Sequence, residues 1–156
     1  MQINILAVGE KSPSWVMEGV SEYTSRMPHE CKVKLVTVTT TKRAKNISIL
    51  QAQEREQALL LKHTPRNSYR VALDEHGKSL STSDLASKLE SWMQNTPVLA
   101  LYIGGPDGFT SDFLEQVDIV LSLSSLTMPH MLARLVVVEQ LYRAWTVIQG
   151  HPYHRE

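Results

Sequence analysis

Apolar and polar positions alternate along the chain in blocks that predict strands and helices in turn. Short apolar or alternating runs typical of strands cover Ile3–Val8, Val33–Val38, Tyr69–Leu73, Val98–Ile103 and Asp118–Leu123. Helical periodicity predicts helices over residues 12–27, 47–61, 79–94, 111–116 and 131–149. In the first helix, Ser12 is a plausible N-cap and Pro13 the first helical residue, and the residues 74–78 read as a turn.

Strands that alternate with helices in this way indicate a three-layer α/β fold with a mainly parallel sheet of five or six strands. The length of 156 residues predicts one domain that spans residues 1–156. In open α/β sheets, ligands bind beyond the carboxyl ends of the strands. Those ends are Gly9, Leu73 with Asp74, Gly104–Gly108 and the turn after Leu123.

The last predicted helix is apolar on nearly every side, yet it carries three charged residues. At 100° per residue, Arg134 shares a face with apolar side chains, so its guanidinium needs a partner inside the protein. Glu139 and Arg143 lie four residues apart on the opposite side, in the order that favours an ion pair. A solvated salt bridge explains that pair equally well. A helix so apolar suggests burial on both sides, and a second copy of the chain is the economical partner.

Composition narrows the choice of partners. Sixteen basic and sixteen acidic residues cancel, so any nucleic acid would have to meet a local patch. The single cysteine excludes an internal disulfide, and no cluster of metal ligands is visible. The opening MQINILAVGE lacks the basic leader of a signal peptide, and no run is long enough to span a membrane. We therefore expect a soluble cytoplasmic protein that contacts neither membrane nor metal.

Two turns at predicted strand ends could hold a ligand. The sequence IGGPDG, residues 103–108, contains three glycines that allow close backbone approach, but it matches neither a dinucleotide nor a triphosphate motif. The sequence LSSLTM, residues 123–128, offers hydroxyl and backbone groups. Each turn also has a plain structural reading: a tight turn for the first and local capping by hydroxyls for the second.

Two further segments carry candidate chemistry. TTTKRAKN contains Lys42, Arg43 and Lys45, which could contact phosphate or form a solvated loop. The ending GHPYHRE places Tyr153, His154 and Arg155 together, a set that can stack on a base, bind phosphate and move a proton. A frayed terminus is the alternative.

Taken together, AVG, TKRAKN, IGGPDG, LSSLTMPH, ARLVVVEQLYRAW and HPYHRE closely resemble one family over the whole chain. It is the family of bacterial ribosomal RNA large subunit methyltransferases that act at N3 of a pseudouridine, of the SPOUT (α/β-knot) class. The resemblance implies a C-terminal deep trefoil knot, an S-adenosylmethionine cofactor and a homodimer packed through its first and last helices. It also implies a pseudouridine substrate in a hairpin loop of large-subunit (23S) rRNA on the assembled ribosome.

The resemblance assigns residues to each part of this reaction. The cofactor would lie against Leu73, Gly104, Gly105, Leu123, Ser124, Ser125, Leu126, Thr127 and Met128. The catalytic candidates are His154, Glu139, Arg143, Arg134 and Tyr153, with His154 the first choice of base because its ordinary pKa is near neutrality. RNA would meet Lys42, Arg43, Lys45, His130 and Arg155.

Two other functions fit the residues alone. A phosphate-ester or nucleotide enzyme would use IGGPDG as an anion cradle. A non-catalytic dimeric ligand sensor or ribosome-associated module would bind a ligand without turnover.

Overall fold

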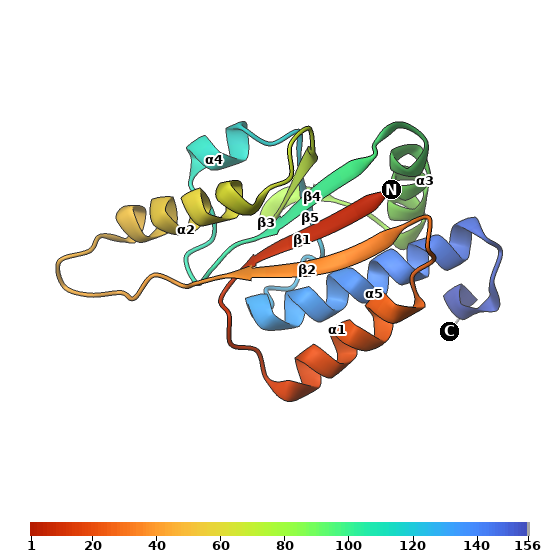
Figure 1. Ribbon diagram of the computed structural model, residues 1–156, viewed down its shortest axis with the longest axis horizontal. Helices are drawn as coiled ribbons and strands as arrows, with labels where there is room; N and C mark the ends of the chain where they lie inside the picture. Colours follow the sequence, from red (N-terminus) through yellow and green to blue (C-terminus); the bar gives the residue numbers. More distant parts are fainter. Residues whose placement is uncertain (156) are drawn as a thin grey trace.

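The computed structural model describes residues 1–155 as a parallel sheet with helices on both faces (Figure 1). The strands are β1 (Gln2–Val8), β2 (Lys32–Val38), β3 (Tyr69–Ser79), β4 (Val98–Ile103) and β5 (Ile119–Ser122). They lie in the order β2-β1-β4-β3-β5, and each of the four pairings is parallel. The predicted α/β class and the five-stranded parallel sheet are confirmed.

The helices divide between the two faces of the sheet. They are α1 (Ser14–Arg26), α2 (Ile49–His63), α3 (Thr82–Asn95), α4 (Ser111–Glu115) and α5 (His130–Ile148), with a 3₁₀ turn η1 at Pro152–Arg155. Ile3 and Ile5 of β1 pack in one core cluster with residues of α1, α3 and α5. Leu6 and Val8 pack in the other with residues of α2 and α4. Because both faces of β1 are buried, the run Ile3–Val8 is apolar apart from Asn4, which is buried as well.

The start of α1 differs from the prediction. Pro13 occupies the N-cap position and makes no side-chain capping bond, so the assignment of Ser12 as the cap was wrong. The Ser12 hydroxyl instead accepts a hydrogen bond from Nη1 of Arg134 at 2.7 Å. The Ser12 hydroxyl, which was predicted to cap α1, is therefore bound to the buried guanidinium of Arg134.

The predicted turn at residues 74–78 is also wrong, because β3 continues to Ser79 through an irregularity. Both Leu73 and Lys78 pair with Leu121 of β5, which leaves the residues between them bulged. Gly77 fits there because a Cβ at this position would lie 2.5 Å from the backbone carbon of Leu121. The bulge carries Asp74, Glu75 and His76 at the carboxyl end of the strand.

The connection from β5 to α5 gives the fold its most consequential feature. β5 lies at the edge of the sheet beside β3, whereas Arg134 of α5 bonds to the carbonyls of Val8 and Gly9, at the end of β1. The segment 123–129 must therefore pass across the carboxyl ends of β3 and β4. No helix within residues 1–155 is long and apolar enough to cross a membrane.

Candidate functional site

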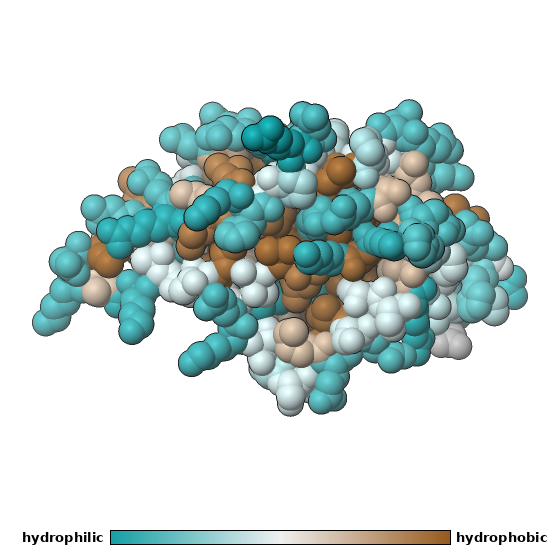
Figure 2. Space-filling model, viewed as in Figure 1, coloured by the Kyte–Doolittle hydropathy of each residue, from teal (hydrophilic) through white to brown (hydrophobic). Residues whose placement is uncertain are grey.

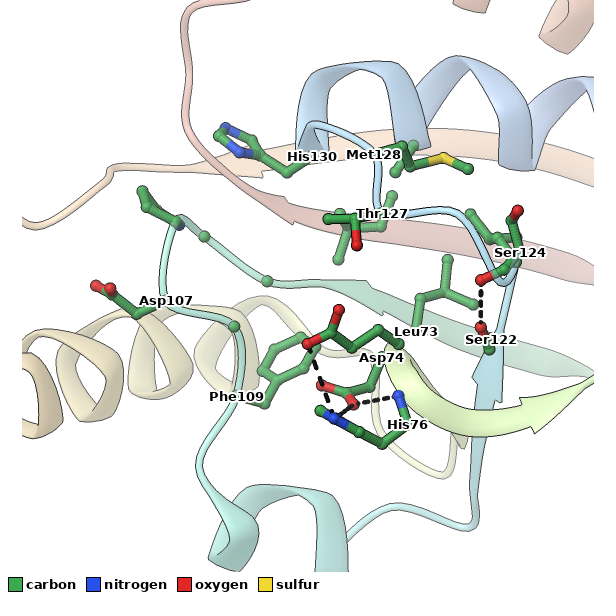
Figure 3. A pocket seen from close by; sticks show the side chains of 18 of the residues that line it. Leu73, Asp74, His76, Asp107, Phe109, Ser122, Ser124, Thr127, Met128 and His130 are labelled. Carbon is green, nitrogen blue, oxygen red and sulfur yellow. Dashed lines mark hydrogen bonds and ion pairs between the residues drawn. The ribbon is translucent and has the colours of Figure 1, made fainter.

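A cleft of about 630 Å³ opens at the carboxyl ends of β3, β4 and β5 (Figure 3). Three segments line it: the end of β3, the turn after β4 and the crossing segment that leads into α5. This volume lies within the range of pockets that hold a small molecule or cofactor. Three of the four strand ends selected from the sequence thus meet at one place, whereas Gly9 is not among the lining residues.

The structure brings together almost all of the residues predicted to hold a cofactor. Those that line the cleft are Leu73, Gly104, Gly105, Leu123, Ser124, Leu126, Thr127 and Met128. Ser125 is exposed and is not among the lining residues. His130, predicted to contact RNA, also lines the cleft.

The crossing segment holds its own shape through hydroxyl groups. The Ser122 hydroxyl donates to the carbonyl of Ser124, and the hydroxyl of Ser124 accepts from the N–H of Leu126, each at 2.9 Å. Local capping is therefore a real function of these serines. Leu126, whose N–H is held by Ser124, is 78% exposed, which is unusual for a large apolar side chain.

Several lining residues were not assigned a role from the sequence, although Asp74 was named there as a strand end. The Asp74 carboxylate accepts from the backbone N–H of His76 at 2.9 Å and faces its Nδ1 at 3.2 Å (Figure 3). Phe109 also lines the cleft and stacks on Phe113, with ring centroids 4.7 Å apart. Gly77 within an acidic stretch was the available signal, since an isolated glycine in a strand often marks a bulge.

His130 stands at the first position of α5, half-buried at the rim of the cleft. Burial lowers the pKa of its imidazole, and the charge of Arg134 lowers it further, while Glu56 opposes this effect weakly. Since its ordinary pKa is about 6.5, this ring is neutral at physiological pH. A neutral imidazole can accept a proton or a hydrogen bond.

Arg134, one of the catalytic candidates, is completely buried. Its Nη2 donates to the carbonyls of Val8 at 2.6 Å and Gly9 at 2.7 Å, and its Nη1 donates to Ser12. Burial lowers the pKa of this guanidinium. The guanidinium therefore has the internal partners expected from the sequence, and they are two carbonyls and a hydroxyl. Because Arg134 is enclosed, RNA phosphate cannot reach it in the single chain.

The basic loop, which we define as residues 39–48 between β2 and α2, projects from the left of the molecule with a largely hydrophilic surface (Figures 1 and 2). Lys42 and Lys45 are exposed there. Arg43 instead pairs with Glu56 at 2.5 Å and with Asp107 at 2.6 Å. Two of the three predicted phosphate contacts are thus available to solvent, and the third is engaged within the protein.

The C-terminal tail folds back on α5. Arg143 pairs with Glu139 at 2.7 Å, which confirms the predicted ion pair, and lies over the ring of Tyr153 at 4.8 Å. The Tyr153 hydroxyl donates to the Glu139 carboxylate at 3.1 Å and shares a hydrogen bond with the hydroxyl of Tyr23 at 3.2 Å. Burial and these two partners raise the pKa of Tyr153, so its hydroxyl stays protonated.

In one chain, this tail and the cleft lie at opposite ends of α5 (Figure 1). A helix of 19 residues is about 28 Å long. His154 is half-buried with Nδ1 close to the carbonyl of His151, and Arg155 is exposed. The predicted catalytic residues of the tail therefore do not reach the cleft of their own chain. Within residues 1–155, no group of three or more His, Cys, Asp or Glu could hold a metal ion.

The fold and cleft define an α/β protein with a cleft of small-molecule size at the carboxyl ends of parallel strands, beside a crossing segment. The family model described as "Predicted SPOUT methyltransferase" matches residues 1–154, and the chain belongs to this family. Two curated relatives carry the name "Ribosomal RNA large subunit methyltransferase H". The protein from Thioalkalivibrio sulfidiphilus is 45% identical over 156 residues, and the one from Hydrogenovibrio crunogenus is 42% identical; both alignments cover all of both chains.

A solved structure shows the same fold at lower identity. It is a probable methylase family protein from Haemophilus influenzae, with a TM-score of 0.56 and 15% identity. The match covers 97% of this chain and 69% of the other. The expected membership of the SPOUT class is confirmed.

Proposed function

We propose that this protein is an S-adenosylmethionine-dependent methyltransferase that modifies N3 of a pseudouridine in a hairpin loop of 23S rRNA. The observation that carries the proposal is the cleft, in which the residues selected for cofactor binding converge from three separate segments. The names of full-length relatives at 42–45% identity support large-subunit rRNA as the substrate. The whole chain would form the one methyltransferase domain and act in the cytoplasm, where ribosomes are.

The cleft fits the proposed cofactor chemically. Leu73, Leu123 and Met128 offer apolar surface, while the glycine turn and the crossing segment offer backbone donors and acceptors. When bound, the cofactor supplies a methyl group already activated by its sulfonium. The chain's own task is to place N3 in line with that group and to accept the imino proton. We also propose that the crossing segment belongs to a deep trefoil knot, because it returns from the sheet edge to β1 over two strand ends.

We propose a homodimer that joins the tail of one chain to the cleft of the other. Trp15 and Met17 of α1 are 55% and 46% exposed, although both are large and apolar. A second copy packed on α1 and α5 would cover these groups. It would also bring the tail of the second chain to the cleft of the first, which the tail of the first chain cannot reach.

In this arrangement, His154 is our first candidate for the proton acceptor, with Glu139 second, and Arg155 would contact RNA phosphate. Glu139 and Arg143 hold Tyr153 directly, so they fix the position of the tail as well as its charge. His130 would meet the substrate at the rim of the cleft. Lys42 and Lys45 would meet RNA from the basic loop.

The first test is a calorimetric titration of S-adenosylmethionine into the purified protein, together with its mass in solution. We expect saturable binding to a dimer. Failure of a folded dimer to bind would contradict the cofactor assignment, and thermal protection by phosphate instead would favour a phosphate-ester enzyme.

Turnover is tested separately with ribosomes that lack the modification. We expect Arg143→Ala to abolish methylation while cofactor binding stays close to that of the wild type, since Arg143 lies at the tail and not at the cleft. Undiminished turnover by this variant would remove its catalytic assignment. Cofactor binding by the wild type without any methylation would favour a ligand sensor.

The zero net charge bears on the form of the substrate. Without a strongly positive surface, affinity must come from shape and from a few contacts. We therefore expect weak binding to an isolated rRNA transcript and firm binding to the ribosome. Tight binding to the naked transcript would contradict recognition of the assembled particle.

A further inference from the structure

One ion-pair cluster joins the basic loop to the turn that lines the cleft. We call residues 104–108 the glycine loop. Arg43 of the basic loop places Nη1 at 2.5 Å from the Glu56 carboxylate, and its Nε and Nη2 lie 2.8 and 2.6 Å from the Asp107 carboxylate. Asp107 belongs to the glycine loop and lines the cleft. A single guanidinium thus connects two loops that are more than 60 residues apart in sequence.

Glu56 of α2 is the buried carboxylate of this cluster. Its side chain is only 2% exposed, and it also accepts the backbone N–H of Thr41 at 3.0 Å. A Cβ on Gly105 would lie 2.8 Å from Glu56 Oε2, so the backbone of the glycine loop packs directly on this carboxylate. A buried carboxylate without its cation would be costly. Arg43 is therefore required where it stands.

The same side of α2 holds the glycine loop through neutral contacts as well. Gln53 Nε2 donates to the carbonyl of Asp107 at 2.8 Å. Gln57 exchanges two hydrogen bonds with Thr110, two residues beyond the glycine loop, at 2.8 and 3.0 Å. These bonds attach the loop and the residues that follow it to α2, whereas Arg43 attaches the loop to the basic loop too. The shape of the cleft wall therefore depends on a residue outside the cleft.

We propose that Arg43 is a positioning residue that holds the glycine loop in the form that receives the cofactor and couples this loop to the RNA-facing basic loop. The inference rests on the proposed cofactor. It replaces the contact between Arg43 and RNA phosphate that the sequence suggested. Lys42 and Lys45 remain the RNA-facing residues, and their loop keeps its position because Arg43 ties it to Glu56 and Asp107.

The test is titration of S-adenosylmethionine without RNA into the wild type, Arg43→Ala and the control Arg55→Ala, which removes an exposed guanidinium from the adjacent helix α2. We expect Arg43→Ala to weaken binding about tenfold or more, equivalent to about 1.4 kcal/mol. Arg55→Ala should bind as the wild type does. Arg43→Lys should recover part of the loss, because an ammonium cannot reproduce the fork that reaches two carboxylates.

Asp107→Asn supplies a second variant in case Arg43→Ala unfolds. Asp107 is partly exposed, so this change should weaken cofactor binding with little effect on the thermal midpoint. If Asp107 acts through Arg43, the double variant should lose no more affinity than Arg43→Ala alone. Additive losses would show that Asp107 contacts the cofactor directly and would overturn its place in this coupling.

Unchanged cofactor binding by both variants, with a raised KM for ribosomes in Arg43→Ala, would overturn the inference and restore Arg43 as an RNA contact. No binding by the folded wild type would instead contradict the proposed cofactor, and the inference with it. The two failures are therefore distinguishable in one set of titrations.

Discussion

Replacement of Gly77 by alanine tests whether the β3 bulge shapes the cleft. The added methyl group would lie 2.5 Å from the backbone carbon of Leu121 and 2.8 Å from its nitrogen and oxygen. No flexible side chain can yield there, so β3 or β5 must shift. Overpacking of this kind costs about 1–3 kcal/mol. For a chain of this size, a loss of about 2 kcal/mol lowers the Tm by about 4–8 °C.

The same shift should reach the cofactor. Leu121 is followed directly by Ser122 and Leu123, which line the cleft, so Gly77→Ala should also weaken S-adenosylmethionine binding. The assays are thermal unfolding and calorimetric titration. Lys78→Ala is the matched control, because Lys78 follows Gly77 directly, is exposed and does not line the cleft. A Tm and an affinity equal to those of the control would refute the contact between the bulge and β5.

Three further changes test the groups around α5. Arg134→Met leaves the strand-end carbonyls without their buried donor and should lower the urea-unfolding free energy by about 1–3 kcal/mol. The pKa of His130 is lower in the folded than in the unfolded chain, so the unfolded chain takes up the proton more readily. Stability should therefore fall as the pH drops below about 6.5, and His130→Gln should flatten this dependence in urea titrations at pH 7.5 and 5.5. Tyr153→Phe removes a hydrogen bond to Glu139 worth about 1 kcal/mol, which should speed amide exchange in η1 with little change in Tm.

The sequence predicted best those features that depend on local pattern. Apolar runs located all five strands, and the rule that ligands bind at strand carboxyl ends led to a single cleft. Glu139 and Arg143 were predicted as a pair because helix geometry alone brings them together. Each of these inferences needs only neighbours in sequence or the general geometry of parallel sheets.

The failures concern contacts between distant segments. Ser12 looked like a helix cap, because nothing in its neighbourhood indicates that Arg134 needs its hydroxyl. Residues 74–78 looked like a turn, because the strand continues only by virtue of its pairing with β5. Arg43 was read as a phosphate contact or part of a solvated loop. Nothing in the sequence indicated its carboxylate partners, because they come from α2 and from the glycine loop. Tertiary structure decided all three.

These corrections also account for how a chain of zero net charge could act on RNA. Of the basic residues assigned from the sequence to catalysis or to RNA, Arg134 is enclosed and Arg43 is neutralised by two carboxylates. Both cations bond to groups at the strand ends or in the loops beside them. Lys42 and Lys45 of the basic loop and Arg155 of the tail remain exposed. So sparse a set gives little non-specific attraction to a polyanion. In the function that we propose, selectivity arises from a substrate whose shape presents one nucleotide to the cleft, as a hairpin loop held by a folded particle does.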